Sequence, residues 1–347
     1  MILVNNPGSW TDVYAPLDHA PWNGCTPTDL IFPFFLFVIG VAIALAFEAP
    51  TRNATARVRL YGKITRRTLL IFGLGLFLNG FPLFDWSEIR IPGVLQRIAL
   101  CYGAASMVAL FLRPRGQAVA AALLVGAYWL AMILGAAPGH AWLNPTGNLA
   151  ATIDEALLHG HLLHDGWDPE GLLGTLPAIA TTLIGVLAGH WVRSARRPIV
   201  RMTGLAVAGA AGIVFGLLMD RWCPINKSLW SPSYVVFTAG VALTLLAVCY
   251  GLIDVLGVQR WATPFVVYGT NPIVAYVLSS IMAKEMLLWR VTQPDGATTD
   301  LQHYIFASVF LPLAEPINAS LLYAASYAVL WLGVAALLYR RGVLIKI

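Results

Sequence analysis

The sequence predicts an all-α, polytopic membrane helical bundle, and three observations point to it. Of the 347 residues, 58% are hydrophobic and only 11% are charged, whereas soluble domains carry roughly 25% charged residues. Nine apolar runs approach the roughly 20 residues that a helix needs to cross a bilayer. The basic residues gather in short connections between these runs, which indicates membrane topology rather than nucleic-acid binding. A cytosolic globular enzyme is excluded, and residues 1–347 are expected to form a single domain in the lipid bilayer.

The apolar runs define nine full spans. In order, they cover residues 30–48, 68–84, 91–112, 118–137, 175–192, 202–219, 233–256, 261–283 and 320–339. A tenth run, 304–313, is about half as long and ends in Pro312, which indicates a re-entrant or interfacial segment. The segment 269–272 interrupts the eighth span, so its freed backbone groups must find partners or line a cavity. Asn271 is therefore a candidate substrate contact, with a simple proline kink at Pro272 as the alternative.

The distribution of charge predicts the orientation of the spans. If the nine runs alternate in direction, sixteen of the 22 basic residues fall on one side of the membrane. The positive-inside rule makes that side cytoplasmic, and most acidic residues then lie on the opposite side. The C-terminus is thus expected in the cytoplasm and residues 1–29 outside it.

Polar chemistry is expected in the exterior segments, because these are long whereas the interior ones are short and basic. His19 lies in the first of them, near Asp18 and Asp29. An imidazole transfers protons near neutral pH, and a neighbouring carboxylate fixes its tautomer and raises its basicity. Alternatively, His19 is an ordinary loop residue and Asp29 only caps the helix that begins at Leu30.

Other polar residues near the exterior span ends are candidates for ligand binding. Arg97 lies inside a span, where a charge is costly unless it faces a polar cavity, pairs with an acid or snorkels. Asp168 and Glu170 precede the next span and either contact a ligand or place negative charge at its helix start. The segment 226–230 supplies Asn226, Lys227 and Trp230, a mixture suited to a sugar or a phosphate and equally to an interfacial anchor.

Neither a disulfide framework nor a metal centre is predicted. Cys101 and Cys249 lie in apolar runs, while Cys25 and Cys223 fall on the same expected side and allow at most one bridge. The histidines at 159, 161 and 164 have spacings that resemble a metal site, but a structural zinc site requires four well-placed ligands and no cysteine is near.

Five short motifs occur in the same order as in a known family. They are His-Ala-Pro-Trp-Asn-Gly at 19–24, Asp-Leu-Ile-Phe-Pro at 29–33, Arg-Ile-Pro-Gly-Val-Leu-Gln-Arg at 90–97, Asp-Pro-Glu-Gly with Gly-Thr at 168–175, and Asn-Lys-Ser-Leu-Trp at 226–230. Together they resemble the transmembrane acyltransferase family of heparan-α-glucosaminide N-acetyltransferase and its bacterial relatives, often called NagX. The resemblance covers nearly the whole chain and implies a multi-pass protein of the bacterial inner membrane.

The resemblance implies an acetyltransferase. An acetyl group would pass from cytosolic acetyl-CoA, the co-substrate, to the amine of a glucosamine-type sugar on the periplasmic side. His19 would be the active-site histidine, acting either as a base or as an acetyl relay, with Asn5 as its polar partner. As hypotheses, Asp29 orients the imidazole, and Asn5 and Asn271 donate to the oxyanion. Trp22 and Asn23 of the same motif are expected to contact the sugar.

The phosphates of CoA would suit the basic cytoplasmic rim. The candidate contacts are Arg66, Arg67, Arg193 and Arg260, although the positive-inside rule alone explains each of them. The pantetheine arm could run roughly 15 to 20 Å into a bundle whose apolar core is about 30 Å thick, which would bring the thioester toward the outer third.

One departure from the family and two rival functions remain. Relatives usually carry a further helix before the Met-Ile-Leu-Val-Asn-Asn with which this chain begins, and its absence puts the packing of the first span in doubt. The main rival is an inner-membrane transporter of N-acetylglucosamine or a related amino sugar, which would need the same polar cavity. A structural scaffold is less consistent with an arginine inside a span. A homodimer is possible, and no nucleic-acid partner is expected.

Overall fold

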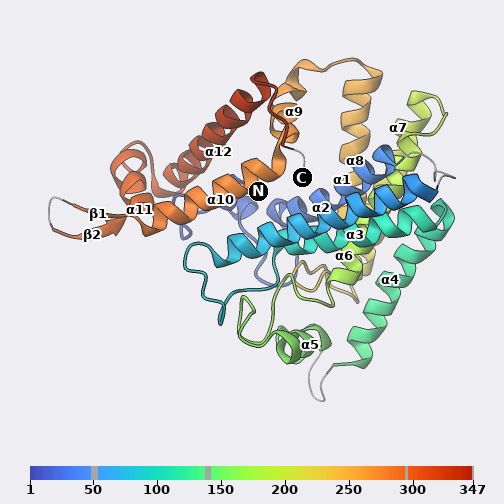
Figure 1. Ribbon diagram of the computed structural model, residues 1–347, viewed down its shortest axis with the longest axis horizontal. Helices are drawn as coiled ribbons and strands as arrows, with labels where there is room; N and C mark the ends of the chain where they lie inside the picture. The colour runs from blue at the N-terminus through green and yellow to red at the C-terminus, as the bar shows by residue number, and fades with distance from the viewer. Residues whose placement is uncertain (48–53, 137–141, 294–295, 346–347) are drawn as a thin grey trace. The chain divides into compact units, whose positions relative to one another are not determined.

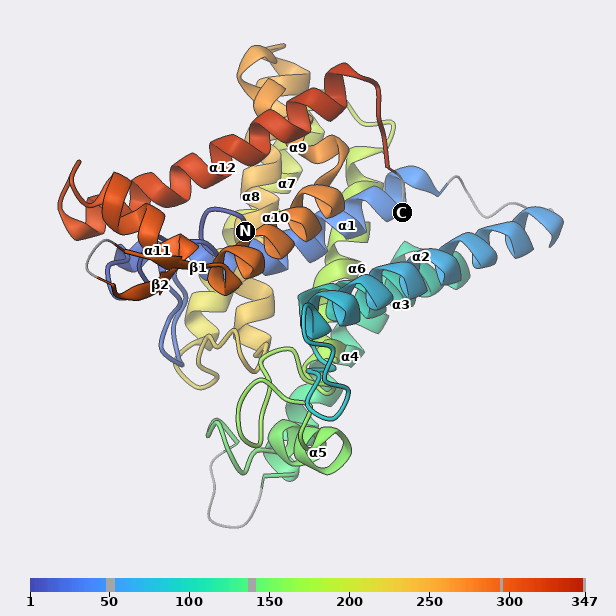
Figure 2. The same ribbon diagram turned by 60° about the vertical axis from the view of Figure 1, so that its left-hand side comes forward.

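The computed structural model describes residues 1–47, 54–136, 142–293 and 296–345 and is predominantly helical (Figures 1 and 2). The chain divides into two compact units. Unit 1 comprises Met1–His19, Thr26–Thr28 and Gln259–Ile347, and unit 2 comprises Ala20–Cys25 and Asp29–Val258. The single-domain organisation expected from the sequence stays a prediction.

Unit 2 holds the first eight α-helices. They are α1 (Ile31–Ala46), α2 (Ala54–Gly80), α3 (Val94–Phe111), α4 (Pro114–Leu134), α5 (Leu149–Leu158), α6 (Thr175–Val192), α7 (Pro198–Met219) and α8 (Pro232–Tyr250). Proline opens α4, α7 and α8, where its missing N–H costs nothing and its fixed φ suits the first turn. Helix α7 packs along α8, α1 along α6, and α2 along α3.

Helices α1 and α6 approach each other closely. A Cβ atom on Gly40 would lie 2.0 Å from the carbonyl oxygen of Thr182, and one on Gly185 would lie 2.0 Å from that of Phe37. Only glycine therefore fits at these two positions. Small residues let helix backbones touch in membranes, where packing rather than water exclusion drives association.

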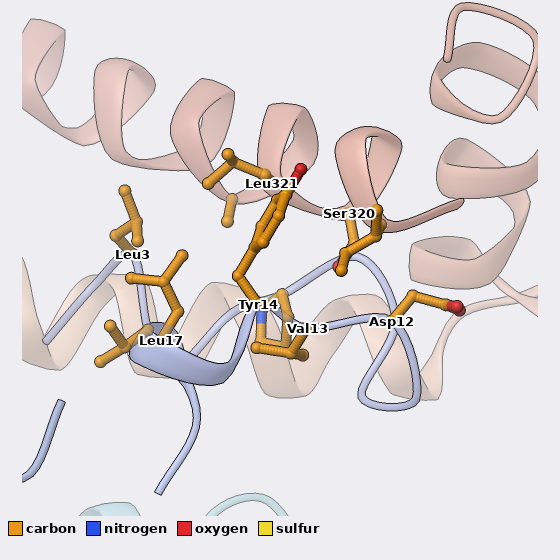
Figure 3. A pocket seen from close by; sticks show the side chains of 11 residues that line it. Leu3, Asp12, Val13, Tyr14, Leu17, Ser320 and Leu321 are labelled. Carbon is orange, nitrogen blue, oxygen red and sulfur yellow. The ribbon is translucent and has the colours of Figure 1, made fainter. Parts of the chain in front are cut away.

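Unit 1 holds the C-terminal elements together with the N-terminal segment. Its elements are α9 (Thr263–Thr270), α10 (Pro272–Leu288), β1 (Arg290–Thr292), β2 (Thr298–Asp300), α11 (Leu301–Ile305) and α12 (Pro316–Arg340). Strands β1 and β2 form an antiparallel hairpin that pairs Arg290 with Asp300. Ser320 of α12 accepts a hydrogen bond from the Ser9 N–H and donates one to the Ser9 carbonyl, both at 3.1 Å. These bonds hold the N-terminal segment along α12, and Figure 3 shows Tyr14 reaching from that segment toward the helix.

The predicted class, a multi-pass helical membrane protein, is confirmed. Within the described residues, seven helices are long and apolar enough to cross a membrane, and α9 with α10 forms a pair bent by 70° that makes up to eight. The predicted span 175–192 coincides with α6, and the interruption expected at 269–272 is the break between α9 and α10. The expected total of nine spans stays a prediction.

Three boundaries or elements differ from expectation. The predicted span 68–84 belongs to α2, which begins earlier and ends at Gly80, before Pro82. Lys63, Arg66 and Arg67 lie within this helix, so its apolar stretch is shorter than the other spans. Helix α5 and the β1–β2 hairpin lie in segments that were expected to be loops, because neither contains a long apolar run. Run 304–313 is helical to Phe310 through α11 and a π-helical turn.

Candidate functional site

Several polar segments of unit 2 meet at one end, here called the loop end. It is formed by residues 20–25, 81–93, 142–174 and 220–231 (Figure 2). The Gly24 N–H donates to the Ile225 carbonyl at 2.7 Å, and the Trp22 indole N–H donates to the Leu143 carbonyl at 2.8 Å. The Ile91 N–H donates to the His161 carbonyl at 3.0 Å. These bonds bring together four of the motifs that the sequence analysis singled out.

Asp29 is a buried carboxylate at the start of α1, with 1% of the residue exposed. Its Oδ2 accepts the Ala20 N–H at 3.1 Å, and its Oδ1 lies 3.5 Å from Nζ of Lys227. The Asp29 carbonyl accepts the Tyr234 hydroxyl at 2.6 Å. Negative charge is favourable near a helix start, and here an ammonium ion also balances it. Two predicted site residues, Asp29 and Lys227, therefore lie together.

Asn226 and Asn23 also lie together. The Asn226 side-chain amide donates to Oδ1 of Asn23 at 3.1 Å, while its own Oδ1 accepts the Leu229 N–H at 2.8 Å. Asn226 is fully buried. Since both of its amide groups are engaged, Asn226 acts as a tie between two loops in this structure, rather than presenting a free amide to a sugar.

Trp230 is not the open aromatic platform that the sequence suggested. Only 1% of the residue is exposed, and its indole N–H donates to the Thr181 hydroxyl at 3.1 Å. Phe32 and Tyr234 pack edge-on against its ring at centroid distances of 5.2 and 5.4 Å. Its φ of 53° lies in the left-handed region that side-chain-bearing residues avoid. Packing on α1, α6 and α8 thus fixes this indole inside the unit.

Arg97 does not snorkel, since only 1% of it is exposed. Its terminal nitrogens donate to the carbonyls of Pro169 at 2.9 Å and Gly171 at 2.8 Å. Its guanidinium carbon lies 5.2 Å from the centre of the Trp230 ring. A guanidinium stacked on an indole while donating to backbone carbonyls is well held, so Arg97 fixes the segment before α6.

Asp168 and Glu170 are both engaged by Arg90, whose role the sequence analysis missed. The Arg90 guanidinium donates to both carboxylate oxygens of Asp168, at 2.8 and 2.7 Å, and to Glu170 at 2.5 Å. Asp168 also accepts the Leu163 and Glu170 N–H groups. The expected contact of these acids with substrate is therefore corrected to an ion-pair cluster that shapes the loop. Membership of Arg90 in the 90–97 motif was the available signal.

Asp154 is a second residue that was missed as a site candidate. It lies on α5 with 1% exposed, and its Oδ1 accepts the Leu172 N–H at 2.8 Å. Burial raises the pKa of this carboxyl group to about 6, and the nearby Asp168 raises it further, against the lowering effect of the Leu172 N–H. A buried acid that titrates near neutrality is a candidate functional group.

The remaining loop-end residues have separate partners. Trp22 packs edge-on against Trp167 at 5.2 Å. His159 pairs with Glu155, whereas the His161 ring nitrogen contacts the Ile89 carbonyl at 2.7 Å. Within the described residues there is no group of three or more potential metal ligands. Cys25 and Cys223 are both free thiols, and burial followed by the charge of Asp29 raises the pKa of Cys25 to about 12.

Four predicted residues belong to unit 1. His19 and Asn5 are exposed, and the His19 N–H donates to Oδ1 of Asp18 at 2.7 Å. The side-chain amide of Asn271 donates to the Val343 carbonyl at 2.9 Å and accepts the Ile345 N–H at 2.8 Å. Both of its amide groups thus hold the segment after α12, which removes it as an oxyanion donor in this structure. Arg260 is exposed.

The other basic candidates lie in unit 2, away from the loop end. Arg193 follows α6 and donates to the carbonyls of Ala44 and Phe47, at 3.0 and 2.7 Å, which caps the end of α1. The Arg67 guanidinium lies 4.9 Å from the centre of the Tyr102 ring. Arg66 and Arg67 are exposed on α2. Phosphate binding by these arginines stays a prediction.

Comparison with curated proteins identifies two relatives. Heparan-alpha-glucosaminide N-acetyltransferase of Homo sapiens is 27% identical, in an alignment that covers all of this chain and 58% of the human protein. The protein of the same name from Mus musculus is 28% identical over 80% of this chain and 50% of its own length. The chain thus spans between half and three-fifths of the relatives it matches. No family model matches the chain.

Proposed function

This chain belongs to the family of the heparan-alpha-glucosaminide N-acetyltransferases, and we propose that it is itself a membrane acetyltransferase that acts on the amine of a glucosamine-type sugar. The observation that carries the proposal is the alignment of the whole chain with the human protein. The buried Asp29–Lys227 pair and the fixed motif segments at the loop end of unit 2 support it, because an acyl-transfer site needs charged groups held in place.

The proposed donor is acetyl-CoA, which would approach from the cytoplasm. Sixteen of the 22 basic residues fall on the side that the positive-inside rule makes cytoplasmic. Arg66, Arg67, Arg193 and Arg260 belong to this set, and their charge suits the phosphates of CoA. The loop end would then face the periplasm of a bacterial inner membrane, where the acceptor sugar would bind.

His19 is the proposed base. In the transfer, the neutral amine nitrogen attacks the thioester carbonyl carbon, a C–N bond forms, and the C–S bond breaks to release CoA as a thiolate. The imidazole of His19 takes the proton that the amine loses and passes it to the thiolate. In a two-step variant the imidazole first carries the acetyl group and the amine then attacks it. His19 directly precedes Ala20, whose N–H is bonded to Asp29, so the chain itself limits how far His19 lies from that carboxylate.

The test uses the purified full chain in nanodiscs with labelled acetyl-CoA and glucosamine. Wild type is expected to form N-acetylglucosamine, and His19→Ala is expected to lose about 100-fold or more of kcat/KM, as loss of a general base does. His303→Ala is the matched control, because His303 is an exposed histidine of the same unit that pairs with Asp300. Absence of product from wild type would overturn the proposal.

The same preparation examines the rival function. In proteoliposomes without an acetyl donor, a transporter of amino sugars would accumulate labelled N-acetylglucosamine, and His19→Ala would leave that flux unchanged. The acetyltransferase is expected to show no such flux.

A further inference from the structure

A small pocket at the loop end of unit 2 separates two opposite charges that do not pair. Its polar lining comes from Arg97, Asn148, Asp154, Asp168 and Ser228, and Trp167 contributes an aromatic wall. The pocket has room for a group about the size of one water molecule. Arg97 and Asp154 both border it, yet no salt bridge joins them in this described part of the chain. A small polar group between them would satisfy both.

Arg97 has an unused donor in this region. Its terminal nitrogens bond to the Pro169 and Gly171 carbonyls, but its Nε, which is buried, has no hydrogen-bond partner among the described residues. Leaving such a donor buried and unpaired costs about 1–3 kcal/mol. The arginine therefore calls for an acceptor that the protein itself does not supply.

Asp154 is the acid on the other side. Its carboxylate presses on the backbone of Gly171, where a Cβ atom would lie 1.8 Å from Oδ2, so only glycine permits this approach. Gly171 thus lies between the two charges, with its carbonyl on Arg97 and its Cα against Asp154. Both side chains are held from the same residue, which fixes the spacing of the pocket.

The other polar lining groups are already committed. Asp168 is bonded to Arg90, and the Asn148 side chain is used to cap α5 and to hold the turn before it. A ligand in this pocket is therefore expected to accept from Arg97 and to donate to Asp154. A hydroxyl group has both capacities in the volume of one oxygen atom.

We propose that this pocket binds one hydroxyl group of the acceptor sugar, which accepts a hydrogen bond from Nε of Arg97 and donates one to the carboxylate of Asp154. This inference rests on the proposed function. Trp167 and the Trp22 ring packed against it would border the apolar face of the same sugar. The pocket then selects hydroxylated amines and sets the orientation of the sugar.

The experiment compares sugar binding rather than turnover, so that it remains informative if acetyl transfer fails. Dissociation constants of glucosamine and of its 3-, 4- and 6-deoxy forms are measured by titration calorimetry with the full chain in nanodiscs. Wild type is expected to bind one of the three deoxy sugars about 10- to 100-fold more weakly, as loss of one hydrogen bond to charged groups predicts. Asp154→Asn is expected to reduce this discrimination to about threefold or less.

Glu155→Gln is the matched control, because Glu155 is the next residue on α5 and pairs with His159 instead. It should keep the wild-type discrimination. If Asp154→Asn weakens all four sugars equally, or if wild type does not distinguish them, the pocket holds a structural water or supports the loop, and the proposal is overturned. Normal discrimination without acetyl transfer would instead refute the proposed reaction alone.

Discussion

The Nζ atom of Lys227 lies 3.5 Å from Oδ1 of Asp29, and the two residues come from opposite ends of unit 2's sequence. The Asp29 carboxylate is almost wholly buried, whereas about a fifth of the Lys227 side chain is exposed. The pair therefore joins the segment before α1 to the segment before α8. Its geometry allows a clear prediction about stability.

Replacing Lys227 by Met is expected to destabilise the protein by about 1–3 kcal/mol. Breaking a fully buried ion pair costs about 3–5 kcal/mol, and the partial exposure of Lys227 lowers that value. Thermal unfolding in detergent measures the change. The double variant Asp29→Asn with Lys227→Met should be less damaged than the sum of the two single variants, because the uncompensated charge is gone. Simple additivity would contradict the pairing.

Arg90 is expected to tolerate no replacement, including lysine. Arg90→Lys keeps the charge but cannot reproduce the fork that engages both oxygens of Asp168 and also reaches Glu170. A loss of about 2–4 kcal/mol is expected, close to that of Arg90→Ala. Limited proteolysis of the 142–174 segment, read by mass spectrometry, should show new cleavage in both variants. An unchanged pattern in Arg90→Lys would show that charge alone suffices.

Asp154 should make stability depend on pH. Its folded pKa of about 6 lies above the ordinary value of 3.8, so the folded protein holds this proton more tightly than the unfolded chain. The resulting stabilisation is complete below about pH 4 and is lost as the pH rises through 6. Asp154→Asn does not titrate, so its melting temperature relative to wild type should rise between pH 4 and 7, by an amount equivalent to at most about 3 kcal/mol. Glu155→Gln should show no such trend.

The contact between α1 and α6 predicts an asymmetry between two glycines. Gly40→Ala places a Cβ against the backbone oxygen of Thr182, and overpacking of this kind costs about 1–3 kcal/mol or more. Gly73→Ala on α2 meets nothing within 4 Å, and it should be neutral or stabilise the helix by up to about 1 kcal/mol. Melting temperatures of the two purified variants check this. Equal melting temperatures would mean that α1 and α6 are not in contact.

The spans were largely accessible from the sequence, because an apolar run of the right length has few alternatives in a membrane. Thr175–Val192 matches the expected limits at both ends. Helix α5 was missed since its ten residues, Leu149–Leu158, do not stand out from a polar loop by apolar length. What holds it is an Asn148 cap and the buried Asp154, neither of which is a length signal.

The partners of the site residues were less accessible than the residues themselves. Arg90 meets Asp168 across 78 positions of sequence, and no local pattern encodes such a pair. Trp230 lies among proline and serine residues and was expected to be exposed, but three helices that pack around it bury its ring. Residue types and motif order indicated where polar groups gather, whereas tertiary packing decided which of them are already used within the protein.

The glycine contact between α1 and α6 has a mechanical consequence. Asp29 stands at the head of α1, and the segment clamped by Arg90 and Arg97 leads into α6. Two rods in backbone contact cannot slide past each other without a clash, so the floor of the loop end behaves as one stiff piece. Any opening that admits a bulky molecule must then come from the covering parts, α5 and the 142–148 turn above all, as a hatch swings on a fixed frame.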